Sequence, residues 1–129
     1  MPLKYAAFFI VDQKDKALLI RYSQGKNKGF FSGAGGHIEK EDKNCKHAAI
    51  RELREETGLN YHNLDILSEK NWIHNKVTKI FVIRVSMIPL IKLSEEHDIC
   101  KRIKLKNLKK YPLAPAFADS LSKNLSLLN

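Results

Sequence analysis

The strongest constraint in this chain is a cluster of acidic residues with helical spacing. Glu52, Glu55 and Glu56 are spaced i, i+3 and i+4, so on a helix their carboxylates leave from one face. Such like-charge neighbours destabilise a helix, and Gly58 marks its end, where the helix dipole disfavours acids. Arg51 can pair with Glu55 but cannot neutralise the whole cluster. A hard divalent cation, Mg²⁺ or Mn²⁺, could do so; the alternative is a solvated acidic face.

A glycine-rich stretch precedes this helix and favours the metal interpretation. Gly33, Gly35 and Gly36 allow the backbone to approach a ligand closely and to adopt positive φ. Their carbonyl and N–H groups are then free to face a metal or a phosphate. The sequence therefore predicts a glycine turn that leads into the acidic helix.

The acidic segment resembles a known family. Residues 51–59, Arg-Glu-Leu-Arg-Glu-Glu-Thr-Gly-Leu, are similar to the second half of the Nudix box of MutT-like hydrolases, without a mismatch. The first half departs from the pattern by one extra residue between Gly36 and Arg51. It also has Asp42 where the family has Glu.

We expect the extra residue to lie in the loop Lys40–Lys43, because an insertion inside the helix would rotate its start away from the carboxylate face. In that loop Asp42 or Glu41 could reach Arg51 and replace the family's Glu.

The resemblance implies an α/β fold, specifically a Nudix-type α/β/α sandwich with a mixed β-sheet. It also implies metal-dependent hydrolysis of a pyrophosphate bond in a nucleoside diphosphate derivative. Mg²⁺, with Mn²⁺ as a substitute, is the expected cofactor. Glu52 is the leading candidate for the base that deprotonates the attacking water, and Arg51 is expected to orient the carboxylates. The expected metal ligands are the Gly35 carbonyl, Glu52, Glu55 and Glu56.

Residues 31–36 resemble the Trp-Asn-Gly-x-Gly-Gly stretch of the Nudix branch that removes oxidised purine nucleoside triphosphates. Phe31 stands for Trp and Ser32 for Asn. This resemblance predicts a nucleoside triphosphate, intact or oxidised, that is cut to monophosphate and pyrophosphate. The predicted substrate contacts are Phe31, Ser32, Gly36 and His37. A purely local bond from Ser32 to the backbone is the alternative.

Other functions remain open at this stage. They are removal of diphosphate or cap from RNA 5′ ends, hydrolysis of ADP-ribose or dinucleoside polyphosphates, and non-catalytic nucleotide binding.

A second stretch, Ser94–Leu108, resembles a downstream Nudix segment, with Arg102 in place of a family Trp. Glu96, ahead of Glu95 and His97, is a candidate for an additional metal ligand or a second base. The alternative is a polar loop before a strand.

Hydrophobic patterning predicts the remaining elements. We expect Trp72 to lie in the core rather than to stack on a base. The expected elements are a hairpin of Leu3–Val11 and Ala17–Tyr22, a helix from about Asn44 to Thr57, a strand within Lys76–Ile88, and a terminal helix carrying Leu113, Phe117, Leu121 and Leu125.

The length of 129 residues suits one domain, 1–129. No targeting signal or membrane-length apolar run is evident, and Cys45 and Cys100 have no metal or disulfide spacing. A cytoplasmic protein with free thiols is expected, as a monomer or homodimer.

The chain is basic, with a formal net charge of +9, and the segment Lys101–Lys110 contains six basic residues and no acid. Such lysines can simply block the edge of a sheet. They can equally attract a small nucleotide or RNA.

Overall fold

The computed structural model describes residues 2–124 and 126. Leu125, expected in the terminal helix, lies outside the described residues. The elements in chain order are β1 (Tyr5–Asp12), β2 (Lys16–Tyr22), β3 (Phe31–Ser32), β4 (Ala34–His37), α1 (Cys45–Thr57), the 3₁₀ helix η1 (Tyr61–Asn63), β5 (Ile66–His74), β6 (Thr78–Val85), β7 (His97–Lys104), the 3₁₀ helix η2 (Leu105–Lys110) and α2 (Pro115–Asn124).

The strands form one mixed sheet around β1. Strand β1 pairs in parallel with β6 over its whole length, from Tyr5 opposite Thr78 to Asp12 opposite Val85. It also pairs antiparallel with β2 and β4, which confirms the predicted hairpin. Strand β7 adds to β2, and β5 adds to β6. Because β1 has neighbours on both edges and is covered on both faces, it is a nearly continuous apolar run.

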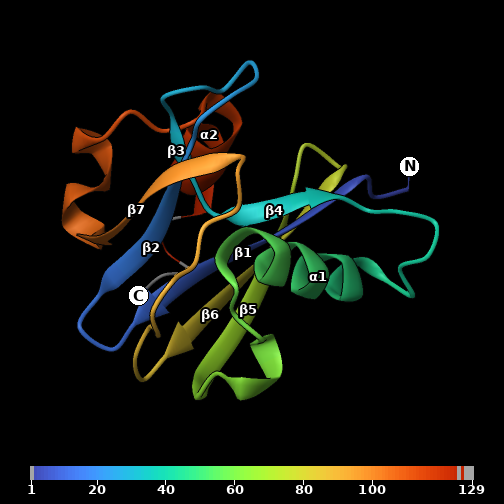
Figure 1. The fold of residues 1–129 in the computed structure, drawn as a ribbon, viewed down its shortest axis with the longest axis horizontal. Coiled ribbons are helices and arrows are strands. Elements are labelled where there is room, and N and C mark those ends of the chain that lie inside the picture. Colours follow the sequence, from blue (N-terminus) through green and yellow to red (C-terminus); the bar gives the residue numbers. More distant parts are fainter. Residues whose placement is uncertain (1, 125, 127–129) are drawn as a thin grey trace.

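Helices cover both faces of the sheet (Figure 1). Phe8 and Ile10 of β1 pack with α1 in one core cluster. Phe9 and Val11 point to the opposite face and pack with α2 and η2. The predicted α/β/α sandwich with a mixed sheet is therefore confirmed.

The boundaries of α1 follow from its caps. The Asn44 side chain accepts a hydrogen bond from the His47 N–H at 2.8 Å, and Gly58 ends the helix at φ 76°. Leu53 is fully buried, whereas Ile50 is only partly buried. Leu53 is the residue that anchors α1 to the sheet.

The glycine stretch is a strand and not the predicted turn. Among the described residues, positive-φ glycines occur only at positions 25, 29 and 58. Glycine at position 35 is required for another reason, because a Cβ there would lie 2.4 Å from the Ala7 Cβ on the paired strand. The stretch therefore brings β4 close to β1 and does not bend the chain.

Near the C-terminus, α2 begins at Pro115, later than predicted, because Leu113 forms an isolated bridge with Phe31 instead. Trp72 is buried, as predicted, and its indole N–H donates to the Ser120 Oγ at 2.7 Å. The cysteines Cys45 and Cys100 are free thiols. No described helix has the length and apolar character needed to cross a membrane.

Candidate active site

The three glutamates of α1 enter different surroundings. Glu55 is exposed, with 55% of its side chain accessible, whereas Glu56 is only 4% exposed. Glu52 lies between these extremes. The three glutamates are therefore close together on the helix but differ in how far the fold buries their side chains.

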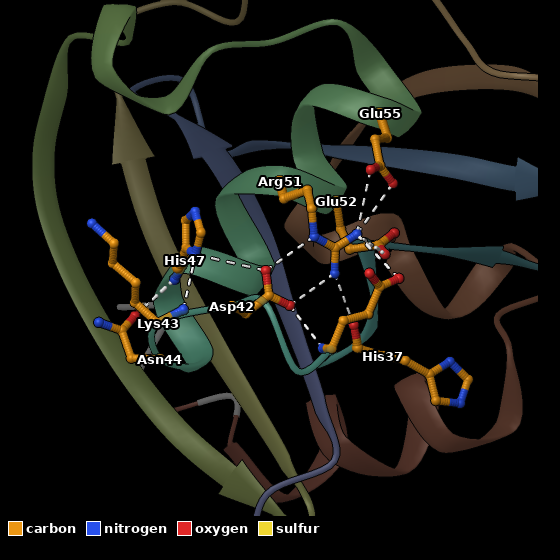
Figure 2. Close-up of polar contacts among 9 residues, drawn as sticks. His37, Asp42, Lys43, Asn44, His47, Arg51, Glu52 and Glu55 are labelled. Carbon is orange, nitrogen blue, oxygen red and sulfur yellow. Dashed lines mark hydrogen bonds and ion pairs between the residues drawn. The ribbon is translucent and has the colours of Figure 1, made fainter.

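Arg51 balances two of these carboxylates. Its Nη1 lies 3.0 Å from the Glu52 Oε1 and 3.3 Å from the Glu55 carboxylate. Its Nη2 donates to the His37 carbonyl at 3.1 Å, which ties α1 to the end of β4. Figure 2 shows the guanidinium surrounded by carboxyl groups, with the His37 ring pointing away from it.

The altered loop supplies a further partner for Arg51. Both oxygens of Asp42 accept hydrogen bonds from the guanidinium, at 3.1 Å from Nε and 3.0 Å from Nη2 (Figure 2). The neighbouring guanidinium lowers the pKa of Asp42 below its usual value. Because α1 begins at Cys45, the extra residue lies in the loop before the helix. Both predictions about this insertion are confirmed.

Within the part of the chain that the structure describes, Glu56 has no arginine partner comparable to that of Asp42. Its Oε1 accepts a hydrogen bond from the Gly35 N–H at 2.7 Å. Among the described residues, the basic group within ion-pair distance of Glu56 is the His97 imidazole, at 3.8 Å. Burial, and next the charge of Glu52, raise the pKa of Glu56 to about 8. The fold therefore holds a carboxylate where its negative charge is disfavoured.

Two residues of the downstream segment meet Glu56. One ligand atom each from Glu56, Glu96 and His97 lie within 4.8 Å of one another. Glu96 is exposed and His97 is buried, and burial lowers the pKa of His97. The sequence ranked Glu96 above His97, and the structure brings both to the cluster.

Tyr22 is a residue that the sequence analysis missed. Its ring packs on the His97 ring with centroids 4.7 Å apart. Burial raises the pKa of Tyr22, and the charges of Glu56, Glu96 and Glu52 raise it further. Nothing in the sequence marked this residue, since it only ends a hydrophobic strand.

The predicted substrate contacts are not gathered at one place. Phe31 is 4% exposed and packs edge-on against Tyr111 in the core cluster on the α2 side of the sheet. The Ser32 hydroxyl donates to the Gly33 carbonyl at 2.7 Å, which is the local bond named as the alternative. The aromatic contact expected from Phe31 is therefore a core contact in this fold.

The other two predicted contacts lie beside the carboxylates. A Cβ at Gly36 would lie 2.6 Å from the Glu52 Cδ, so glycine leaves the space that the Glu52 carboxylate occupies. His37 is exposed and its ring packs against Tyr5 at a centroid distance of 4.6 Å.

The donor set fits a divalent cation. Carboxylate oxygens from Glu56 and Glu96 suit Mg²⁺ or Mn²⁺, and their mutual repulsion lacks a fixed counter-charge. In an antiparallel ladder the N–H and C=O of one residue face the same side. Because the Gly35 N–H donates to Glu56 and not to β1, the Gly35 carbonyl also faces this side.

Comparisons with known proteins identify the family of this chain. The model of the NUDIX domain matches residues 1–124, so the chain belongs to the Nudix family. Nudix hydrolases cleave pyrophosphate bonds and depend on divalent metal ions. No match was found among the curated proteins.

Solved structures show the same fold. An Ap4A hydrolase from C. elegans in a binary complex is 21% identical, with 97% of this chain and 98% of that chain covered and a TM-score of 0.75. A MutT protein from Methanosarcina mazei Go1 is 23% identical, with 98% and 94% covered and a TM-score of 0.67. A bifunctional NMN adenylyltransferase/ADP ribose pyrophosphatase from Francisella tularensis, complexed with AMP and a Mn ion, is 18% identical; 100% of this chain and 42% of that chain are covered, with a TM-score of 0.79. At these identities the likeness establishes the fold.

Proposed function

We propose that this chain is a Mg²⁺-dependent hydrolase that cuts a nucleoside triphosphate to monophosphate and pyrophosphate. The observation that carries the proposal is the position of Glu56. This carboxylate is buried against the Gly35 N–H, is flanked by Glu96, and lacks a Lys or Arg partner among the described residues. A group that is costly to bury in its charged form needs a cation, and its neighbours are oxygen donors.

The proposed ligands are Glu56, Glu96, Glu52, Glu55 and the Gly35 carbonyl. A bound divalent ion would neutralise phosphate charge and lower the pKa of a coordinated water. Glu52 would act as the base and accept the proton of the attacking water, with Glu96 as the second candidate. The water oxygen would bond to the α-phosphorus while the bond from that phosphorus to the α,β-bridging oxygen breaks, and the bridging oxygen would depart as part of pyrophosphate.

Arg51 supports this assignment of Glu52. Its hydrogen bond holds the Glu52 carboxylate in one orientation, and Asp42 holds the guanidinium from the other side. Burial raises the pKa of Glu52 above its usual value, whereas the hydrogen bond from Arg51 opposes that rise. A carboxylate whose pKa is raised in this way accepts a proton more readily than an exposed one.

The choice of a nucleoside triphosphate is supported by the likeness of residues 31–36 to the nucleotide-sanitising branch. It requires a base contact other than the buried ring of Phe31. The intact site loop argues against a purely non-catalytic module, because Asp42 fully engages Arg51.

A turnover screen tests the proposal. Nucleoside triphosphates, their oxidised forms, ADP-ribose, Ap4A and triphosphorylated RNA are compared at matched Mg²⁺, with Glu56→Gln as the inactive control. We expect a nucleoside triphosphate to give the highest kcat/KM. Preference for ADP-ribose or Ap4A by more than about tenfold, roughly 1.4 kcal/mol of transition-state stabilisation, would overturn this choice.

RNA 5′ ends are the second candidate because six basic side chains are exposed along β7 and η2. Strand β7 pairs only with β2 among the described strands, so it is an edge strand. If RNA is the substrate, its KM rises steeply with salt, whereas that of a mononucleotide changes little. The exposed basic residues are Lys101, Arg102, Lys104, Lys106, Lys109 and Lys110.

A further inference from the structure

His97 has two buried polar atoms without a hydrogen bond. Neither its Nδ1 nor its Nε2 has a partner among the described residues, and its side chain is 0% exposed. The Ser94 Oγ, in the same turn, is also buried without a partner. Buried polar atoms are almost always paired, so this set calls for a ligand that the protein atoms do not supply.

The imidazole points at the carboxylate cluster. Its Nε2 lies 3.8 Å from the Glu56 Oε2, which is too long for a hydrogen bond. Metal–nitrogen and metal–oxygen bonds are each about 2.0–2.2 Å long, so an ion between these two atoms could bind both. Glu96 offers a third ligand atom within 4.8 Å of the other two.

An irregularity in the pairing of β2 with β7 turns the His97 side chain inward. The register between β2 and β7 shifts at Arg21 and Tyr22, so that Tyr22 lies opposite His97 and Asp98 is the extra residue. Asp98 turns outward and accepts two hydrogen bonds from Arg21, at 3.0 and 2.8 Å. The Tyr22 ring then packs on the imidazole and limits its rotation.

We propose that His97 is a metal ligand, so that Glu56, Glu96 and His97 form a mixed carboxylate and imidazole site that prefers a first-row transition ion such as Mn²⁺ over Mg²⁺. The proposal rests on the proposed function only in requiring a divalent ion at this cluster. Imidazole binds transition ions better than it binds Mg²⁺, whereas carboxylates alone accept both.

The first test measures the dissociation constants of Mn²⁺ and Mg²⁺ for the metal-free protein by calorimetry. His97→Phe keeps an aromatic ring against Tyr22 but removes both nitrogens, and it should lower the preference for Mn²⁺ over Mg²⁺ by about tenfold or more. His97→Gln offers a hard oxygen and should retain Mg²⁺ binding. His74→Phe is the matched control, since His74 is also buried, with an unpaired Nε2, but lies away from the cluster beside Asp119. It should leave the preference unchanged.

The second test detects the nitrogen ligand directly in the unmodified protein. Electron spin echo envelope modulation of the Mn²⁺-loaded protein should show coupling to a directly bound imidazole ¹⁴N. The signal should persist in His74→Phe and disappear in His97→Phe or His97→Gln.

Absence of the nitrogen signal in the unmodified protein, or an unchanged metal preference in His97→Phe, would overturn the ligand role of His97. Failure of Glu56→Gln to weaken Mn²⁺ binding would instead overturn the proposed site itself. The two failures are therefore distinguishable.

Discussion

The carboxylates around Arg51 and Glu56 fall into two groups that differ in how their charge is balanced. Asp42, Glu52 and Glu55 all contact the Arg51 guanidinium, at distances of 3.0 to 3.3 Å. Glu56, the residue after Glu55 on the same helix, is more deeply buried than Glu52 and Glu55 and contacts a backbone N–H instead. The carboxylates of the first group therefore already have a cationic partner within the chain.

This difference in charge balance indicates that the Arg51 group mainly supports the site, whereas the Glu56 group binds the ion most directly. An arginine partner stabilises a carboxylate in its charged form, as the lowered pKa of Asp42 indicates, and it opposes the rise that burial causes in the pKa of Glu52. The pKa of Glu56, raised to about 8, marks a position where the fold disfavours the charge that the residue normally carries. We therefore interpret the Arg51 group as the frame that positions the site, from which Glu52 and Glu55 add ligand oxygens, and the Glu56 group as the place where the cation is anchored.

The largest expected effect is on turnover when Glu56 is changed. Glu56→Gln should lower kcat/KM by about 10²-fold or more, because it removes a proposed ligand without changing the shape of the side chain. Glu55→Gln should cause a smaller loss, since Glu55 is exposed and already paired with Arg51. Equal losses of kcat/KM in the two variants, with unchanged circular dichroism spectra, would show that Glu55 and Glu56 do not differ in role.

Breaking the frame should reduce both activity and stability. Arg51→Lys removes the planar fork that contacts Asp42 through two nitrogens. We expect kcat/KM to fall by about tenfold or more and the free energy of unfolding to fall by about 1–3 kcal/mol. Urea denaturation and steady-state kinetics on the same sample measure both. Loss of activity without loss of stability would argue for a direct catalytic role of Arg51 instead.

The sequence predicted the frame better than it predicted the binding group. Helical spacing placed the three glutamates on one face, and the resemblance to the Nudix box placed Asp42 or Glu41 near Arg51, because both features are local in the chain. The contact of Glu56 with Gly35 and His97 joins residues from three distant segments. Sequence patterns carry no information about which of three equivalent glutamates is buried.

The glycines and Phe31 show the same limit. Glycine is favoured both by turns and by close strand packing, and only the pairing of β4 with β1 decides between them. Phe31 follows the alternation of a strand, so its face depends on the register with β2, where Arg21 lies opposite. The fold class was predictable, since the apolar runs and the resemblance agree, whereas the direction of each side chain depended on long-range pairing.

A pH titration of stability without metal can sharpen the comparison. Glu56 has a pKa of about 8 in the folded protein, above the usual value of 4.5. A raised pKa contributes stability that is complete below about pH 4.5 and is lost as pH rises to about 8. In EDTA, the free energy of unfolding should therefore fall over this range by on the order of a few kcal/mol more than in Glu56→Gln. Parallel pH profiles for the two proteins would contradict the buried, uncompensated state of Glu56.

The two glycines of β4 should respond differently to the same substitution. Gly36→Ala places a Cβ against the flexible end of Glu52, so activity should fall by about tenfold with little change in melting temperature. Gly35→Ala collides with Ala7 on β1 and should cost about 1–3 kcal/mol of stability. If Gly36→Ala destabilises the protein as much as Gly35→Ala does, then glycine is needed at position 36 for packing of the sheet and not for the position of the Glu52 carboxylate.

The location of the bound ion tests the central claim most directly. Crystals soaked in Mn²⁺ can be examined by anomalous difference maps at the manganese absorption edge. The account predicts a peak bounded by the Glu56 and Glu96 carboxylates, and its loss in Glu56→Gln. A strong peak among Asp42, Glu52 and Glu55 with none beside Glu56 would show that the Arg51 group, and not the Glu56 group, is the metal centre.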